Sequence, residues 1–165
     1  MSVSTVFGTA LIVLVVAPYH EGTKSGEVLP HPSWLRDKAW VMQSAPAPRT
    51  LDKGGRSGIG APREVVVRTP DEWTALWTEH GAGRERPPVD FSREIVVGVF
   101  LGSKPTAGYS VAIVSTIDAN GVLIVRYRVS EPPAGAITAQ VITFPYHLAA
   151  VSKSPAKDVK FEKIP

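Results

Sequence analysis

Histidine is the side chain that most often serves as a general base or a metal ligand near neutral pH. The chain has four, His20, His31, His80 and His147. No two of them have a spacing that would place both imidazoles on one helical face. The chain has no cysteine, which excludes disulfide bonds, thiolate metal sites and a thiol nucleophile. We therefore predict neither a metal site nor a cofactor.

The acidic residues do not form an evident catalytic pair. Asp71 and Glu72 stand where a helix is expected to begin, and Asp90 and Glu94 flank a predicted strand. The sequence places none of them beside a histidine or a nucleophile. We predict that the protein is not an enzyme. An enzyme of unrecognised type is the alternative, because a fold can assemble a site from distant residues.

A glycine-rich run from Gly54 to Gly60 invites comparison with nucleotide-binding motifs. It lacks the Gly-Lys pair of a phosphate loop, and it follows a linker rather than a strand, unlike a dinucleotide fingerprint. Ser57, inside this run, lacks the Gly-x-Ser-x-Gly frame of a nucleophile elbow. The run is therefore interpreted as a turn or a bulge.

Two segments are candidates for protein binding. The first, Gly102 to Val111, connects two predicted strands and carries turn-forming residues and an aromatic side chain. A rigid exposed loop of this kind can present backbone and side chains to a partner, although a plain structural connection with Tyr109 in the core is the alternative. The candidate binding residues are Lys104, Pro105, Thr106, Gly108 and Tyr109, with Pro145, Tyr146 and His147 in the second segment.

A helix and several strands must position these segments. The run Thr69-Pro70-Asp71-Glu72 combines a cap, a first-turn proline and a capping box, and Gly81 is a stop signal. Between these start and stop signals, four residues share one helical face: Trp73, Leu76, Trp77 and His80. His80 is expected to end the helix as a cation that suits the helix dipole.

Strands are expected over 64–68, 94–101, 109–117, 122–129, 146–151 and 159–162, with Asn120-Gly121 as a hairpin turn. We predict an α+β fold, with an antiparallel sheet of about five to six strands and one packed amphipathic helix at about residues 70–80.

Composition divides the chain into three parts. Residues 1–18 contain an apolar run, 6–17, that suits a secretory signal or a membrane tether. Residues 19–62 are rich in proline and glycine and are predicted to be a tether. Residues 63–165 are predicted to be the globular domain. The net charge of +3 is too small to indicate nucleic-acid binding.

Residues 63–162 resemble the C-terminal domain of the PrcB-type protease-complex subunit family. The similarity rests on five stretches: Glu72–Trp77, Val96–Gly102, Lys104–Val111, Leu123–Tyr127 and Gln140–Leu148. The family's loop usually reads Thr-Gly-Gly-Tyr, and Ala107 replaces its first glycine here. The resemblance implies a non-catalytic domain of bacterial envelope or secreted proteins that supports a protease. Many members carry a lipoprotein cysteine, which this chain lacks.

A second resemblance belongs to a different class of protein. The stretch Lys104-Pro105-Thr106-Ala107-Gly108-Tyr109 is similar to the Asn-Pro-Thr-Thr-Gly-Tyr loop of chagasin-like cysteine-peptidase inhibitors. That family has tryptophan where Val111 stands, and its immunoglobulin fold has no place for the predicted helix.

We expect a non-catalytic protein-binding module of the cell envelope or secreted space, whose partner is another protein, with a protease as one candidate. No nucleic acid and no small-molecule cofactor is expected. The chain would be cytoplasmic if the apolar segment is not a signal, and the inhibitor and enzyme interpretations stay open.

Overall fold

The computed structural model describes residues 46–81 and 83–165. These residues form seven strands and one helix, which confirms the predicted α+β class with sheet predominating. In chain order the elements are β1 (Arg49–Gly54), β2 (Pro62–Val67), α1 (Pro70–Gly81), β3 (Glu94–Leu101), β4 (Ser110–Ala119), β5 (Val122–Ser130), β6 (Tyr146–Ser152) and β7 (Asp158–Ile164).

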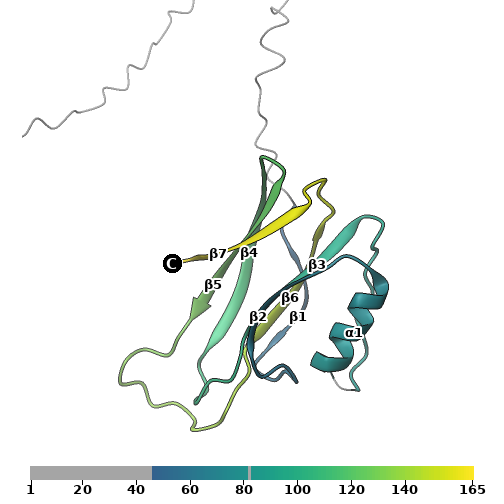
Figure 1. Ribbon diagram of the computed structural model, residues 1–165. Helices are drawn as coiled ribbons and strands as arrows, with labels where there is room; N and C mark the ends of the chain where they lie inside the picture. The colour runs from purple at the N-terminus through teal and green to yellow at the C-terminus, as the bar shows by residue number, and fades with distance from the viewer. Residues whose placement is uncertain (1–45, 82) are drawn as a thin grey trace, which may run out of the picture. The chain divides into compact units, whose positions relative to one another are not determined.

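The strands make two sheets, not the single antiparallel sheet that the sequence suggested. A four-stranded antiparallel sheet has the order β1-β6-β3-β2, and a three-stranded sheet has the order β4-β5-β7 (Figure 1). Strand β7 runs parallel to β5. The chain leaves the small sheet after β5, adds β6 to the large sheet and then returns, and such a crossover connection allows parallel pairing.

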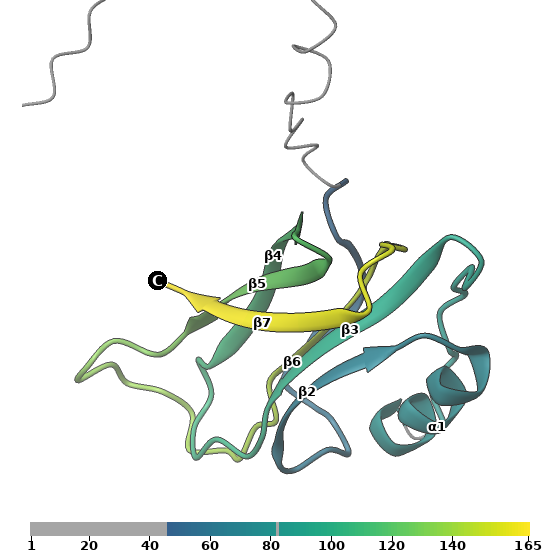
Figure 2. The ribbon, with the colours of Figure 1, turned by 45° about the horizontal axis from the view of Figure 1, so that its top comes forward.

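The large sheet lies between the small sheet and the helix (Figure 2). Side chains of β3 alternate between two cores: Ile95, Val97 and Val99 face the small sheet, whereas Val96 and Phe100 face α1. Strand β3 is therefore buried on both faces, as its continuous apolar sequence predicts.

Helix α1 begins and packs as its sequence predicts. The Glu72 amide donates to Thr69 Oγ1 at 3.3 Å, and Glu72 Oε2 accepts from the Arg68 and Thr69 amides at 2.7 and 3.3 Å. The predicted face is buried, and the Trp73 and Trp77 rings lie 5.3 Å apart between centroids. Each indole N–H donates to a backbone carbonyl of the following loop, so both large rings are buried without an unpaired donor.

The hairpin between β4 and β5 also follows its sequence. Asn120 and Gly121 both have positive φ, 52° and 77°, which is the backbone conformation that an Asn-Gly turn favours. Among the residues described, no helix is long and apolar enough to span a membrane.

The ordered domain begins before residue 63, the boundary that composition suggested. Strand β1, Arg49–Gly54, pairs with β6, and Ile59 is buried against α1. Pattern reasoning missed β1 because it is an edge strand whose side chains are mostly exposed and polar. The apolar run at residues 6–17 and the rest of the predicted tether, up to residue 45, lie outside the described residues.

Candidate functional site

The first candidate segment meets the stretch that precedes the second, residues 137–143, at one end of the fold. Lys104 and Thr143 exchange two backbone hydrogen bonds, with N–O distances of 2.8 and 2.9 Å. The Ala107 amide donates to the Ala139 carbonyl at 3.0 Å, and Thr143 Oγ1 donates to the Thr106 carbonyl at 3.0 Å. We call residues 104–109 and 137–143 the paired loops. These backbone hydrogen bonds join two stretches that are far apart in the sequence into one surface of fixed shape.

The paired loops expose aliphatic side chains. Ile137 is fully exposed, Ile142 is 63% exposed and Val141 is 50% exposed. Val141 and Ile142 line a surface pocket of about 510 Å³, and Arg56 and Arg84 belong to the same pocket. Exposed aliphatic side chains gathered at one place on a surface are typical of sites where proteins meet.

The first candidate segment divides into exposed and structural residues. Pro105 and Gly108 are exposed, whereas Thr106 and Tyr109 are half-buried. The Lys104 ammonium lies 5.5 Å from the Tyr109 ring centroid, a cation–π contact. Gly108 has a φ of +98°, and a Cβ there would approach Pro132 Cβ to 3.1 Å. The positive φ strongly favours glycine, and the tight approach to Pro132 adds to this preference, so Gly108 shapes the loop.

The second candidate segment is interior rather than exposed. Pro145, Tyr146 and His147 are all buried, because β6 lies in the middle of the large sheet with a core on each face. The expectation that these three residues form an interaction surface is therefore corrected. The accessible part of this region is the stretch just before them, residues 137–143.

His147 connects two sheets through its imidazole. Its Nδ1 accepts a hydrogen bond from the Ile113 amide of β4 at 2.7 Å, and its Nε2 lies 2.9 Å from Thr50 Oγ1 of β1. Because Nδ1 accepts, the proton of the neutral ring sits on Nε2, which donates to Thr50. Burial, reinforced by the nearby charge of Lys53, lowers the pKa of His147 to about 4. The side chain is thus a neutral structural link at physiological pH.

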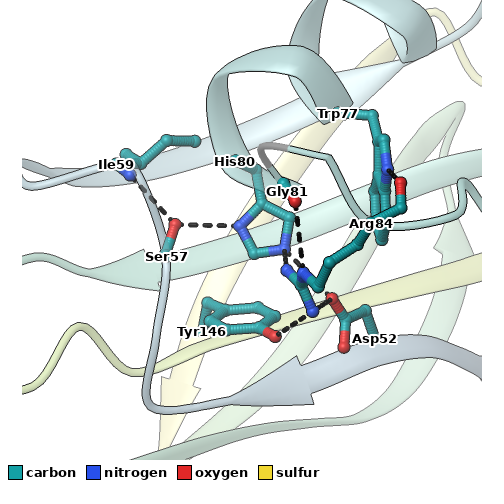
Figure 3. A network of polar contacts seen from close by, with 8 residues as sticks. All are labelled: Asp52, Ser57, Ile59, Trp77, His80, Gly81, Arg84 and Tyr146. Carbon is teal, nitrogen blue, oxygen red and sulfur yellow. Dashed lines mark hydrogen bonds and ion pairs between the residues drawn. The ribbon is translucent and has the colours of Figure 1, made fainter.

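A second buried histidine organises a polar network that sequence reasoning missed (Figure 3). Ser57 Oγ lies 2.8 Å from His80 Nδ1, and Asp52 Oδ2 lies 3.1 Å from His80 Nε2. No local pattern indicated that a carboxylate pairs with a histidine, because Asp52 belongs to β1, which was not predicted. His80 lies in the last turn of α1, as expected, but it is buried and its pKa is lowered, which does not favour the expected cation.

Arg84 completes this network. Its Nη1 contacts Asp52 Oδ2 at 2.7 Å and Tyr146 Oη at 3.4 Å, while its Nη2 lies 3.0 Å from His80 Nε2. Burial lowers the pKa of His80, and the Arg84 charge lowers it further against the opposing hydrogen bond to Asp52. Burial alone would raise the pKa of Asp52, but the hydrogen bond to His80 and the Arg84 charge bring it below its usual value.

The order Ser57–His80–Asp52 resembles the nucleophile, base and carboxylate of a serine hydrolase. We therefore asked whether its geometry would allow catalysis. A working base must become an imidazolium, and here the Arg84 guanidinium lies against the same nitrogen that faces Asp52. The His80 side chain has no exposed surface, and Ser57 Oγ already accepts the Ile59 amide at 3.0 Å. These contacts favour a structural network that joins β1, the glycine-rich run and α1.

Within the described part of the chain, no three histidine or acidic side chains gather as metal ligands would. Residues 95–152 match the family model described as PrcB C-terminal. This segment is therefore similar to the PrcB C-terminal family. The predicted resemblance is confirmed over these residues, which run from β3 to β6 and include both paired loops. No curated protein and no solved structure matches the chain significantly.

The extent of the PrcB C-terminal match separates the two candidate sites. The paired loops lie inside it, whereas Asp52, Ser57, His80 and Arg84 all lie outside it. The comparisons do not show a similarity to chagasin-like inhibitors, and that resemblance stays a prediction based on one short loop. The family match suggests a subunit associated with a protease complex.

Proposed function

We propose that the chain is a non-catalytic subunit that binds a protease through the paired loops. The observation that carries this proposal is the placement of Ile137, Val141 and Ile142. All three are exposed inside the segment that matches the PrcB C-terminal family, and backbone hydrogen bonds of Ala139, Val141 and Thr143 hold the stretch that carries two of them. A preformed surface loses little conformational entropy on binding, so apolar contacts there contribute more fully to affinity.

We further propose that the protein works in the cell envelope or the secreted space. The support for this location is the apolar run at residues 6–17, which suits a signal or a tether and lies outside the described residues. Comparing the cytoplasmic and envelope fractions of the native cell by immunoblot would test it. Recovery in the cytoplasm alone would contradict the proposal.

Co-purification from the native cell tests the protease partner. The tagged full chain is compared with Ile137→Ser and with Val114→Ser, a matched control because Val114 is also an exposed aliphatic residue but lies on β4. We expect a peptidase to be recovered with the wild type and the control, and at least about fivefold less with Ile137→Ser, corresponding to loss of an anchor worth about 1 kcal/mol. Absence of any peptidase from the wild-type sample would refute the proposal.

A hydrolase is the second candidate function, because of the hydrogen-bonded order Ser57–His80–Asp52. The purified chain can be incubated with generic ester and peptide substrates beside Ser57→Ala. Turnover that Ser57→Ala abolishes would favour the hydrolase, whereas equal background rates in both proteins favour the non-catalytic subunit.

A further inference from the structure

Two surface pockets beside the paired loops form one continuous concavity. A pocket of about 510 Å³ and a neighbouring one of about 370 Å³ share Arg56, Arg84 and Ile142 in their linings. We call this concavity the basic groove. Val141, Ile142 and Phe144 supply its apolar side, and the glycine-rich run from Gly54 to Gly58 supplies much of its opposite side.

The charges of the basic groove have one sign. Two arginines line it, and no aspartate or glutamate does so among the described residues. Arg56 is exposed and makes no ion pair with any residue that the structure describes. A negatively charged group would therefore meet an uncompensated cation at this side of the groove.

Arg84 adds a directed donor. Its Nε donates to the Gly81 carbonyl, its Nη1 contacts Asp52 and Tyr146, and one hydrogen of its Nη2 is directed to His80. A guanidinium has five N–H donors, so one hydrogen of Nη2 is left over. The side chain is 46% exposed, and its orientation is already fixed by these contacts. It can donate to a ligand with little further loss of conformational freedom.

The backbone on both sides of the groove is tied together. The Phe144 amide donates to the Gly55 carbonyl at 2.8 Å, and the Gly58 amide donates to the His80 carbonyl at 3.1 Å. A Cβ at Gly58 would overlap the Glu79 carbonyl oxygen, so the glycine-rich run lies directly against the helix end. The run thus serves as one wall of a preformed groove.

We propose that the basic groove binds a segment of the protein partner in which carboxylate side chains alternate with aliphatic ones. The carboxylates contact Arg56 and the free hydrogen of Arg84, and the aliphatic side chains contact Val141 and Ile142. This inference rests on the proposed function, because it names the chemistry of the partner segment that the same surface receives. An anionic membrane surface is the competing occupant.

The test measures binding of the full chain to three labelled twelve-residue peptides by fluorescence anisotropy. One alternates Glu with Leu, one alternates Lys with Leu and one alternates Glu with Ser. We expect the Glu-Leu peptide to bind most tightly and to bind more weakly at high salt. We expect Arg56→Glu to weaken it about tenfold, Arg56→Gln less, and Ile142→Ser about fivefold, as for the loss of single anchors.

Matched controls separate the groove from general surface effects. Like Arg56→Glu, Lys160→Glu replaces an exposed cation with a carboxylate, but it does so on β7. Val114→Ser removes an exposed aliphatic side chain from β4. Both should leave binding unchanged. The proposal is overturned if the Glu-Leu peptide fails to bind, if the Lys-Leu peptide binds equally, or if the groove variants behave like the controls.

Vesicles of phosphatidylcholine with phosphatidylglycerol test the competing occupant. Vesicle binding that Arg56→Glu and Ile142→Ser abolish, without peptide binding, would overturn the proposal in favour of a membrane. If a peptidase is still recovered from cells while the peptides fail, only the groove assignment is overturned. If no peptidase is recovered, the proposed function fails whatever the peptides do.

Discussion

Replacing His147 should change how the stability of the domain depends on pH. Its pKa is about 4 in the folded chain and 6.5 without the fold. Above pH 6.5 the ring is neutral in both states, and the fold has the full benefit of its two hydrogen bonds. Between pH 6.5 and 4 the unfolded chain binds a proton that the folded chain does not. The free energy of unfolding therefore falls as the pH falls.

The size of this effect follows from the two pKa values. Each pH unit between them corresponds to about 1.36 kcal/mol, so acidification from pH 7 to below 4 costs the domain about 3 kcal/mol through His147 alone. That is a large part of the 5–15 kcal/mol, roughly, by which small domains are stable. The physical cause is local: protonation of Nδ1 would set two donors, this nitrogen and the Ile113 amide, against each other at 2.7 Å.

The measurement is urea unfolding of the full chain at pH 7.5, 6, 5 and 4.5, followed by tryptophan fluorescence. His147→Gln is the informative variant, because its amide can accept from Ile113 and donate to Thr50 without titrating. We expect the variant to lose less stability than the wild type as the pH falls, because its amide does not titrate. The loss that remains comes from His80, whose pKa is also lowered by burial. Parallel pH profiles of the two proteins, or a His147 ring that titrates near 6.5 by NMR, would refute the reasoning.

Three further predictions concern the core, the chain boundary and the loop. Trp73→Ala should lower the free energy of unfolding by about 3–5 kcal/mol, because the ring is buried and its indole N–H is bonded; a loss below 1 kcal/mol in urea unfolding would contradict its docking. A chain of residues 61–165 lacks β1 and Ile59 and should unfold at much lower urea than residues 46–165, whereas equal midpoints would make β1 dispensable. Thr106→Ala should change stability by no more than about 0.5 kcal/mol, since no hydrogen bond of its side chain holds the loop, and a larger change by calorimetry would show otherwise.

The elements that can be predicted from the sequence are those determined by residues close together in the chain. The capping box at Thr69 and Glu72, the helical spacing of the tryptophans and the Asn120-Gly121 turn each depend on residues a few positions apart. Residues 104–109 were identified as a candidate loop for the same reason, whereas residues 137–143 were not. Their pairing with each other was not predictable, because Lys104 and Thr143 meet only after β4 and β5 are in place.

The residues that escaped prediction depend on long-range pairing. Strand β1 has an exposed polar sequence and exists because β6 supplies its hydrogen bonds. Without β1, Asp52 cannot be placed beside His80, and the polar network of Figure 3 cannot be predicted. The strand at 146–151 was predicted, but its central place in the large sheet, which buries His147, depends on pairing with β1 and β3.

The central place of β6 in the large sheet has a consequence for synthesis on the ribosome. Strands β1 and β3 both pair with β6, so a nascent chain carries β3 with one vacant side, and β1 with no partner, until residues 146–152 have emerged. The apolar edge of β3 would meanwhile be open to other nascent chains or to chaperones. A premature stop before Tyr146 would leave that edge permanently open, and the fragment would be a substrate for quality-control proteolysis rather than a smaller folded domain.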